Sequence, residues 1–123
     1  VKEYQASIAG LGFKHPSGIL EIIGDKAYHV GMQINSGEIH VFGNSGNHIG
    51  KEMKGGKIII HGNARNFVGE KMKGGLILIK GNALDAIGMK MTGGEIIIEG
   101  KAGYWIGESA KGGVIKILLQ SEF

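Results

Sequence analysis

The chain has 123 residues, of which 42% are hydrophobic and 20% are charged, and its formal net charge is +3. This length and composition fit one folded domain and exclude a disordered chain, while the modest charge argues against a dedicated nucleic-acid-binding protein. The absence of cysteine excludes disulfides and metal sites built on sulfur. No apolar run has the length of a membrane span and no signal peptide is evident, so we expect a soluble, cytoplasmic protein.

The N-terminal segment, residues 1–17, is an imperfect copy of a repeat that begins at Gly18. Leu11 and Gly12 hold the positions that Val30 and Gly31 hold one repeat later. Terminal repeats of solenoids are usually atypical. We therefore predict that residues 1–17 form a cap on the first coil and that residues 18–123 form the repeat domain.

Glycine marks the repeat, since 24 of the residues are glycine and only one is proline. One column of glycines recurs at a constant 19-residue interval and consists of Gly18, Gly37, Gly56, Gly75, Gly94 and Gly113. Two further columns follow, beginning at Gly24 and Gly31. A fixed interval of this size is the signature of a repeat architecture.

Apolar residues alternate after each glycine of the first column. The second and fourth positions after it are isoleucine, leucine or valine in every repeat, as in Ile58 and Ile60. This spacing is typical of a strand with one buried face. Further apolar residues flank the third glycine column, so we expect about two short strands in each repeat.

Stacking is needed because one 19-residue coil cannot offset the entropy of its own ordering. Coils about 4.8 Å apart bond strand to strand and join their apolar rings into one core. Such crossovers are right-handed. The sequence therefore predicts an all-β, right-handed parallel β-helix of about six 19-residue turns. Its turn residues include Gly37, Gly56, Gly75 and Gly94, and Leu118, Leu119 and Phe123 are expected to cover the last coil.

Some positions that should face solvent are apolar. Ile59, Leu78 and Ile97 share one outward column, and Leu76 lies two residues from Leu78. A contiguous exposed apolar patch usually marks a protein interface. We predict that these four residues dock onto another protein subunit or onto a second copy of the chain, and we expect neither a nucleic-acid nor a membrane partner.

Two polar columns receive structural interpretations. Asn44, Asn63 and Asn82 form one column, and asparagine tolerates left-handed backbone and stacks well in parallel coils. We interpret them as a ladder in the turns. His29 and His48 form another column, but two imidazoles lack the further ligands that most metal sites need, so we expect no metal.

No catalytic residue or cofactor is expected either. Glu38 and Glu95 share a column but lie three coils apart, about 14 Å, which is too far for a glycosidase pair. Glycine motifs such as the one at residues 43–46 lack the following helix that a phosphate loop requires.

The motif G-G-x-I-x-I-x-G-N-A, followed by V-G-x-x-M-x-G-G, is clearest at residues 55–75 and extends over roughly residues 18–117. It resembles the GXGXG-repeat family, which includes one of the subunits of archaeal tungsten or molybdenum formylmethanofuran dehydrogenase and the C-terminal domain of the glutamate synthase large subunit. The recurring M-K-G-G at residues 53–56 and 72–75 is closer to the dehydrogenase subunit. The resemblance implies a β-helix used as a scaffold, with the flavin, iron–sulfur or metal-pterin chemistry on other domains or subunits.

Several functions stay open at this point. The favoured hypothesis is a non-catalytic scaffold subunit or domain of a multisubunit oxidoreductase, similar to the GXGXG-repeat subunit of formylmethanofuran dehydrogenase. The alternatives are a stand-alone subunit of the glutamate synthase GXGXG type, or a β-helix that binds a small ligand or acts as an enzyme through a groove. Arg65 is the one residue that fits a groove site even loosely.

Overall fold

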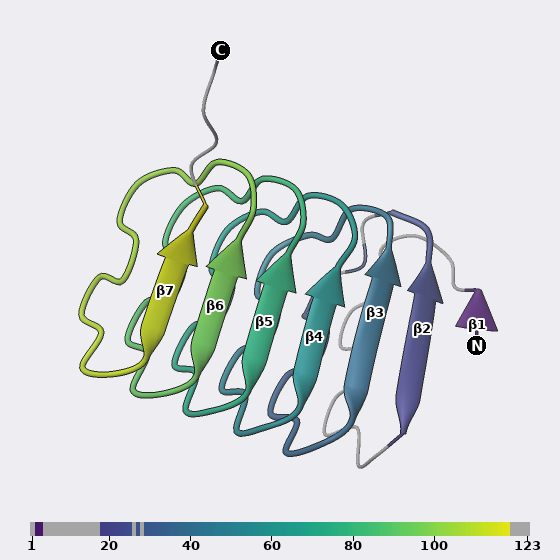
Figure 1. The fold of residues 1–123 in the computed structure, drawn as a ribbon, viewed down its shortest axis with the longest axis horizontal. Coiled ribbons are helices and arrows are strands. Elements are labelled where there is room, and N and C mark those ends of the chain that lie inside the picture. Colours follow the sequence, from purple (N-terminus) through teal and green to yellow (C-terminus); the bar gives the residue numbers. More distant parts are fainter. Residues whose placement is uncertain (1, 4–17, 26, 28, 119–123) are drawn as a thin grey trace.

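The protein is a right-handed parallel β-helix, which confirms the predicted fold class (Figure 1). The computed structural model describes residues 2–3, 18–25, 27 and 29–118. Seven strands lie side by side in one parallel sheet, in the order of the sequence. They are β1 (Lys2–Glu3), β2 (Ile19–Ile23), β3 (Glu38–Phe42), β4 (Lys57–Ile60), β5 (Leu76–Ile79), β6 (Glu95–Ile98) and β7 (Val114–Ile117).

The register of the sheet follows the sequence repeat. From β2 to β7 each strand begins one repeat after the previous one, so the described chain closes five complete coils between Ile19 and Val114, slightly fewer than predicted. β1 continues the sheet, with Lys2 opposite Ile22. Residues 4–17 and 119–123, on which most of the two predicted end caps depends, lie outside the described residues.

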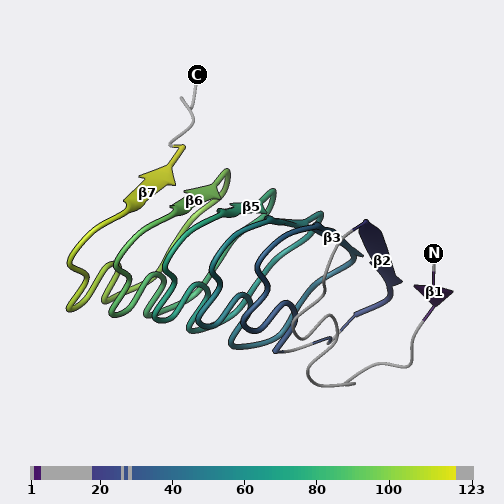
Figure 2. The same ribbon diagram turned by 90° about the horizontal axis from the view of Figure 1, so that it is seen from below.

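The described part of each coil contains one strand, so the prediction of about two is wrong. Seen from below, the strands line one side of the stack and the rest of each coil folds back in a series of bends (Figure 2). Closely spaced left-handed residues cause these bends, as at His48, Gly50 and Glu52, whose φ angles are 61°, 68° and 57°. Such φ values interrupt an extended strand. The sequence motif alone did not reveal them, because two of the three positions are not glycine.

The bends still bond to the neighbouring coils. The N–H of Gly50 donates to the carbonyl of Val30 at 2.8 Å, and the N–H of His48 donates to the carbonyl of Asn66 at 2.9 Å. Each coil is therefore tied to the coil before it and the coil after it on every side, which satisfies backbone groups that would otherwise be costly to bury.

The core is a single apolar column inside the coils. Its residues come from the inward strand positions, such as Ile58 and Ile60, and from the two columns represented by Val68 and Met72, all with 0% exposure. Within the described ranges the chain forms no helix long and apolar enough to cross a membrane.

Candidate functional site

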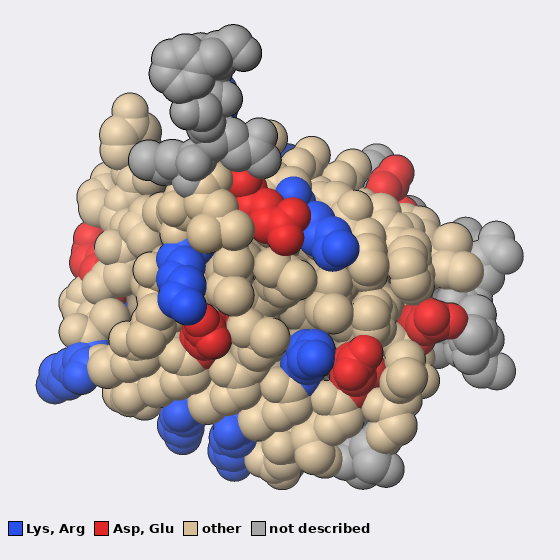
Figure 3. Space-filling view, in the orientation of Figure 1, with Lys and Arg blue, Asp and Glu red and all other residues tan. Residues whose placement is uncertain are grey.

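The outer face of the sheet carries the apolar residues that the sequence singled out. Ile59 on β4, Leu78 on β5 and Ile97 on β6 are direct neighbours in the strand register. All three are half-buried, as is Leu76. Figure 3 views this face, where uncharged surface lies between scattered basic and acidic side chains. The four side chains therefore form a continuous apolar stripe, here called the outer stripe.

A hydrogen-bonded cluster adjoins the outer stripe on β3 and beside the end of β4. The Nε2 atom of His40 lies 2.6 Å from the Oε2 atom of Glu38, and the Nδ1 atom of His40 lies 2.9 Å from the Nε2 atom of His61. Phe42 stacks on His61 with ring centroids 4.4 Å apart. His40 occupies the same outward column as the outer stripe, opposite Ile59.

Hydrogen bonding and burial lower the pKa values of two members of this cluster, Glu38 and His61. The hydrogen bond from His40 lowers the pKa of the Glu38 carboxyl. Burial, and then the neighbouring His40 and Lys80, lower the pKa of His61. With the Nε2–H of His40 donating to Glu38, the Nδ1 atom of His40 can accept the Nε2–H of His61. The three side chains therefore form one continuous hydrogen-bonded chain.

Sequence reasoning missed this cluster, although a signal for it exists. Glu38 and His40 are two residues apart on one strand face, and His61 lies one 19-residue interval plus two positions beyond His40. That offset places it diagonally across adjacent strands, within reach of long side chains. A comparison within single columns overlooks such diagonal neighbours.

The asparagine column forms a ladder of hydrogen bonds. The Oδ1 atom of Asn44 accepts the N–H of Asn63, and the Oδ1 atom of Asn63 accepts the N–H of Asn82, each at 2.8 Å. Asp25 begins the ladder by accepting the N–H of Asn44 at 3.0 Å, and Lys101 ends it. The left-handed backbone that we expected here lies elsewhere, in the columns of His48 and Glu52 among others.

A second ladder runs beside the first and was not predicted. The Oδ1 atom of Asn47 accepts the N–H of Asn66, that of Asn66 accepts the N–H of Asp85, and that of Asp85 accepts the N–H of Tyr104, at 2.8–2.9 Å. The column mixes asparagine, aspartate and tyrosine, so it does not show up as one residue type. The accepting residues are asparagine and aspartate, and both carry an Oδ1 atom the same number of bonds from the backbone.

The turn glycines named from the sequence precede the strands. Gly37, Gly56, Gly75 and Gly94 have φ angles of 81–87°, in the left-handed region. A side chain on Gly75 would also approach the backbone oxygen of Gly56 to 2.8 Å. These positions thus combine a glycine conformation with close approach between coils.

His29 and His48 lie side by side, one coil apart. Their ring centroids are 4.8 Å apart and tilted by 52°, and His48 stacks on Phe67. The Nδ1 atom of His48 is 3.1 Å from Glu70. Burial, followed by His48 and Lys51, lowers the pKa of His29. In the part of the chain that the structure describes, no three histidine, cysteine or acidic side chains are grouped to hold a metal ion.

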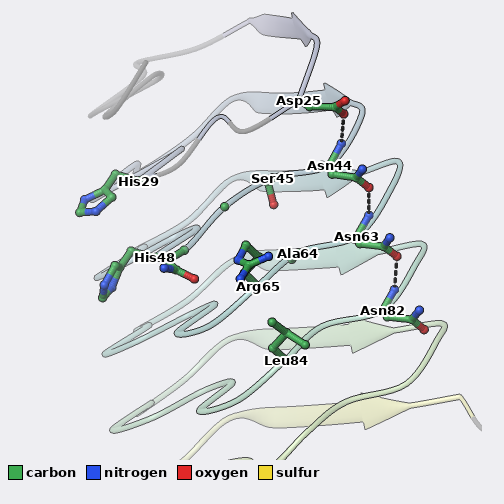
Figure 4. Close-up of a pocket in the computed structure, with 12 residues that line it drawn as sticks. Asp25, His29, Asn44, Ser45, His48, Asn63, Ala64, Arg65, Asn82 and Leu84 are labelled. Atoms are coloured by element: carbon green, nitrogen blue, oxygen red, sulfur yellow. Dashed lines mark hydrogen bonds between the residues drawn. The ribbon is translucent and has the colours of Figure 1, made fainter. Parts of the chain in front are cut away.

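A groove of about 980 Å³ opens between the first asparagine ladder and the histidine pair (Figure 4). Arg65, an exposed residue, lies between these two walls, and Leu84 follows it one coil later. The groove brings Arg65 together with the ladder residues, a combination that the sequence analysis did not make.

Comparison of the chain with models of protein families and with curated proteins finds no match. The resemblance to the GXGXG-repeat family therefore rests on the repeat motif. Two surface features can carry a function: the outer stripe with its histidine cluster, and the groove beside the asparagine ladder.

Proposed function

We propose that the chain is a non-catalytic scaffold subunit or domain of a multisubunit oxidoreductase and that it docks through the outer stripe. One observation carries the proposal: the sheet fills the core with its inner face and still presents isoleucine and leucine on its outer face. Ile59, Leu78 and Ile97 lie outside the buried core, which the inward columns form.

The form of the stripe supports a docking role. Three apolar side chains on adjacent strands give a flat contact surface, which suits a partner protein better than a small ligand. Charged residues of both signs lie at its edges, including the Lys116–Glu95 ion pair at 3.0 Å. An apolar centre with a polar rim is the usual anatomy of a protein interface.

The choice of an oxidoreductase partner is supported by the repeat motif. The M-K-G-G sequences at residues 53–56 and 72–75 resemble those of the GXGXG-repeat subunit of formylmethanofuran dehydrogenase, and the resemblance implies that redox chemistry is carried by another subunit. A glutamate synthase complex is the second candidate partner on the same grounds.

The test is isolation of the tagged full chain from its native cells, followed by mass spectrometry and multi-angle light scattering. We expect a stoichiometric complex that contains a flavin, iron–sulfur or metal-pterin subunit, and we expect Leu78→Lys to abolish it. Leu84→Lys is the matched control, because Leu84 is an exposed leucine, 41% accessible, beside the groove.

The outcomes decide between partners. A homo-oligomer that Leu78→Lys dissociates, with no redox subunit attached, would retain the docking face and refute the oxidoreductase assignment. A complex that survives Leu78→Lys would refute the docking face. Circular dichroism of both variants shows whether the β-helix is retained.

A further inference from the structure

The groove beside the asparagine ladder has features that the scaffold function does not use. Its walls are the ladder of Asn44, Asn63 and Asn82 on one side and the histidine pair on the other (Figure 4). Gly46 holds the position that Arg65 holds one coil later, and it has no side chain to fill the space. The groove is therefore open along the coil that precedes Arg65.

Hydrogen-bond donors without acceptors line one wall. The Oδ1 atom of each ladder asparagine accepts a backbone N–H at 2.8 Å, which fixes the orientation of the amide. The Nδ2 groups of these residues have no acceptor within the described ranges. They recur once per coil, at about 4.8 Å, the spacing between parallel strands. Such groups bind water or the oxygen atoms of a ligand.

Arg65 provides the fixed positive charge. Its guanidinium group has no ion-pair or hydrogen-bond partner among the described residues. Of the described lining residues, Asp25 is the acidic one; it lies two coils away and bonds to the N–H of Asn44. An unpaired guanidinium with planar donors matches a carboxylate better than any other common group except phosphate.

Ser45 adds a buried hydroxyl to the same lining. The residue is 2% exposed, and its Oγ atom has no hydrogen-bond partner among the described residues. Alanine occupies the equivalent position in the next two coils, at Ala64 and Ala83, so packing does not require the hydroxyl. Burial of an unsatisfied hydroxyl is unfavourable, so the packing of the coil does not account for a serine at this position.

We propose that this groove binds a hydroxy-carboxylate, with the carboxylate on Arg65 and the hydroxyl oxygens on the ladder amides. The amides donate to hydroxyl oxygens, Asp25 can accept from a hydroxyl at the far end, and Leu84 offers an apolar contact. This chemistry is found in free hydroxy acids and in acidic sugars. The site is independent of the outer stripe and of the proposed scaffold function.

Phosphate is the less suitable anion for this groove. Phosphate sites depend on several free backbone N–H groups or on a helix N-terminus. Here most of the backbone donors of the lining are already used; for example, the N–H of Ser45 donates to the carbonyl of Asn63 and the N–H of Gly46 donates to the carbonyl of Ala27, at 2.8 and 2.7 Å. Arg65 alone then supplies the charge.

The test is NMR titration of the ¹⁵N-labelled full chain with D-glucuronate, trigalacturonate, the neutral sugar maltotriose and inorganic phosphate. We expect saturable shifts of the Asn44, Asn63 and Asn82 side-chain amides and of the Arg65 Nε–H with the carboxylates, and none with maltotriose. Tighter binding of trigalacturonate identifies an acidic oligosaccharide as the natural class, and equal binding identifies a free hydroxy acid.

Two variants test the geometry. Arg65→Gln should weaken carboxylate binding by at least about tenfold, the usual effect of losing a charge-assisted pair. Asn63→Asp keeps the acceptor oxygen of the ladder, as Asp25 does naturally, but replaces a donor with a negative charge. It should weaken binding by a similar factor while the fold is retained. Lys80→Gln, which removes an exposed charge beside the histidine cluster, is the matched control and should leave the affinity unchanged.

Three results would overturn the proposal. One is the absence of any saturable shift at ligand concentrations of about 10 mM. Another is equal weakening by Arg65→Gln and Lys80→Gln, which would indicate non-specific charge attraction. The third is phosphate binding as tight as that of the carboxylates. None of these results bears on docking through the outer stripe, so the two proposals fail separately.

Discussion

The two sides of the same strands follow different rules. On the inner side, β4 and β5 place Ile58, Ile60, Ile77 and Ile79 at zero exposure. On the outer side, the same strands carry lysine, isoleucine and leucine in no fixed order, and β3 carries glutamate and histidine. Each inner side chain must fit the same cross-section in every coil, so its identity is set by packing. The outer residues are free of that constraint, and function is to be sought among them.

The largest difference in stability should appear between two truncations, one of an inner residue and one of the outer residue next to it. Ile77→Ala should lower the free energy of unfolding by about 2–5 kcal/mol, because a fully buried isoleucine leaves a cavity. Leu78→Ala, on the adjacent outward position, should cost only about 1 kcal/mol, because that side chain is half-buried and its space opens to solvent. Urea unfolding of both variants measures the difference. Equal losses would show that the outer stripe is part of the core.

The contact between coils can be tested at two glycines with similar backbone angles. Gly18 and Gly75 have φ angles of 80° and 87°. At Gly18 an added Cβ meets no atom of the described residues within 4 Å, whereas at Gly75 it approaches the Gly56 oxygen to 2.8 Å. Gly18→Ala should therefore cost about 1–2 kcal/mol from backbone strain alone, and Gly75→Ala should cost roughly 1 kcal/mol more. Thermal unfolding followed by circular dichroism gives both values, and similar losses would refute the role of coil spacing.

A smaller effect is expected in the exposed ladder. Asn63→Ala removes the 2.8 Å bond to the N–H of Asn82, so stability should fall by about 0.5–1.5 kcal/mol. Asn63→Asp retains an acceptor and should restore most of that loss. Chemical denaturation of the two variants makes the comparison. A loss with Asn63→Asp as large as with Asn63→Ala would mean that the amide nitrogen, and not the oxygen, supports the coil.

The smallest effect should come from acid on the outer histidine cluster. Burial lowers the pKa of His61 below its ordinary value of 6.5, so the unfolded chain takes up its proton first as the pH falls. Stability from this group is therefore complete above 6.5 and is lost as the pH falls through the folded pKa. Between about pH 7.5 and about pH 5.5, Tm should fall, and His61→Gln should reduce that fall by only about 1–2 °C. Differential scanning calorimetry at the two pH values measures this fall in Tm. If the fall is as large in His61→Gln as in the parent chain, the role given to His61 is wrong.

The sequence was sufficient for the inner side of the fold. Columns such as Ile39, Ile58, Ile77 and Ile96 repeat without an insertion, and their spacing of two within each repeat identifies the strand and its buried face. Parallel register and the single apolar core follow from stacking. The same reasoning overestimated the strand content, since it took every apolar column as extended backbone.

The bends and the surface clusters were harder to predict. Phe67, Lys71 and Lys90 adopt left-handed φ angles of 57–61° without being glycine or asparagine. Hydrogen bonds to adjacent coils impose that conformation; for example, the N–H of Lys71 donates to the carbonyl of Met89 at 2.8 Å. The intrinsic backbone preference of these residues is against a left-handed φ angle. The groove and the histidine cluster each combine residues from different coils and different columns. Their members can be found in the sequence only by comparing positions diagonally across neighbouring repeats.

The constant interval between coils is also a unit of length. Each coil of the described chain bonds to the one before it and the one after it, so duplicating one interval would lengthen the molecule by a single rung and create no new kind of contact. An insertion one position longer or shorter than that interval would instead put an isoleucine column in water. A protein built in this way can change the distance between two attached partners in steps of about 4.8 Å, through duplication alone.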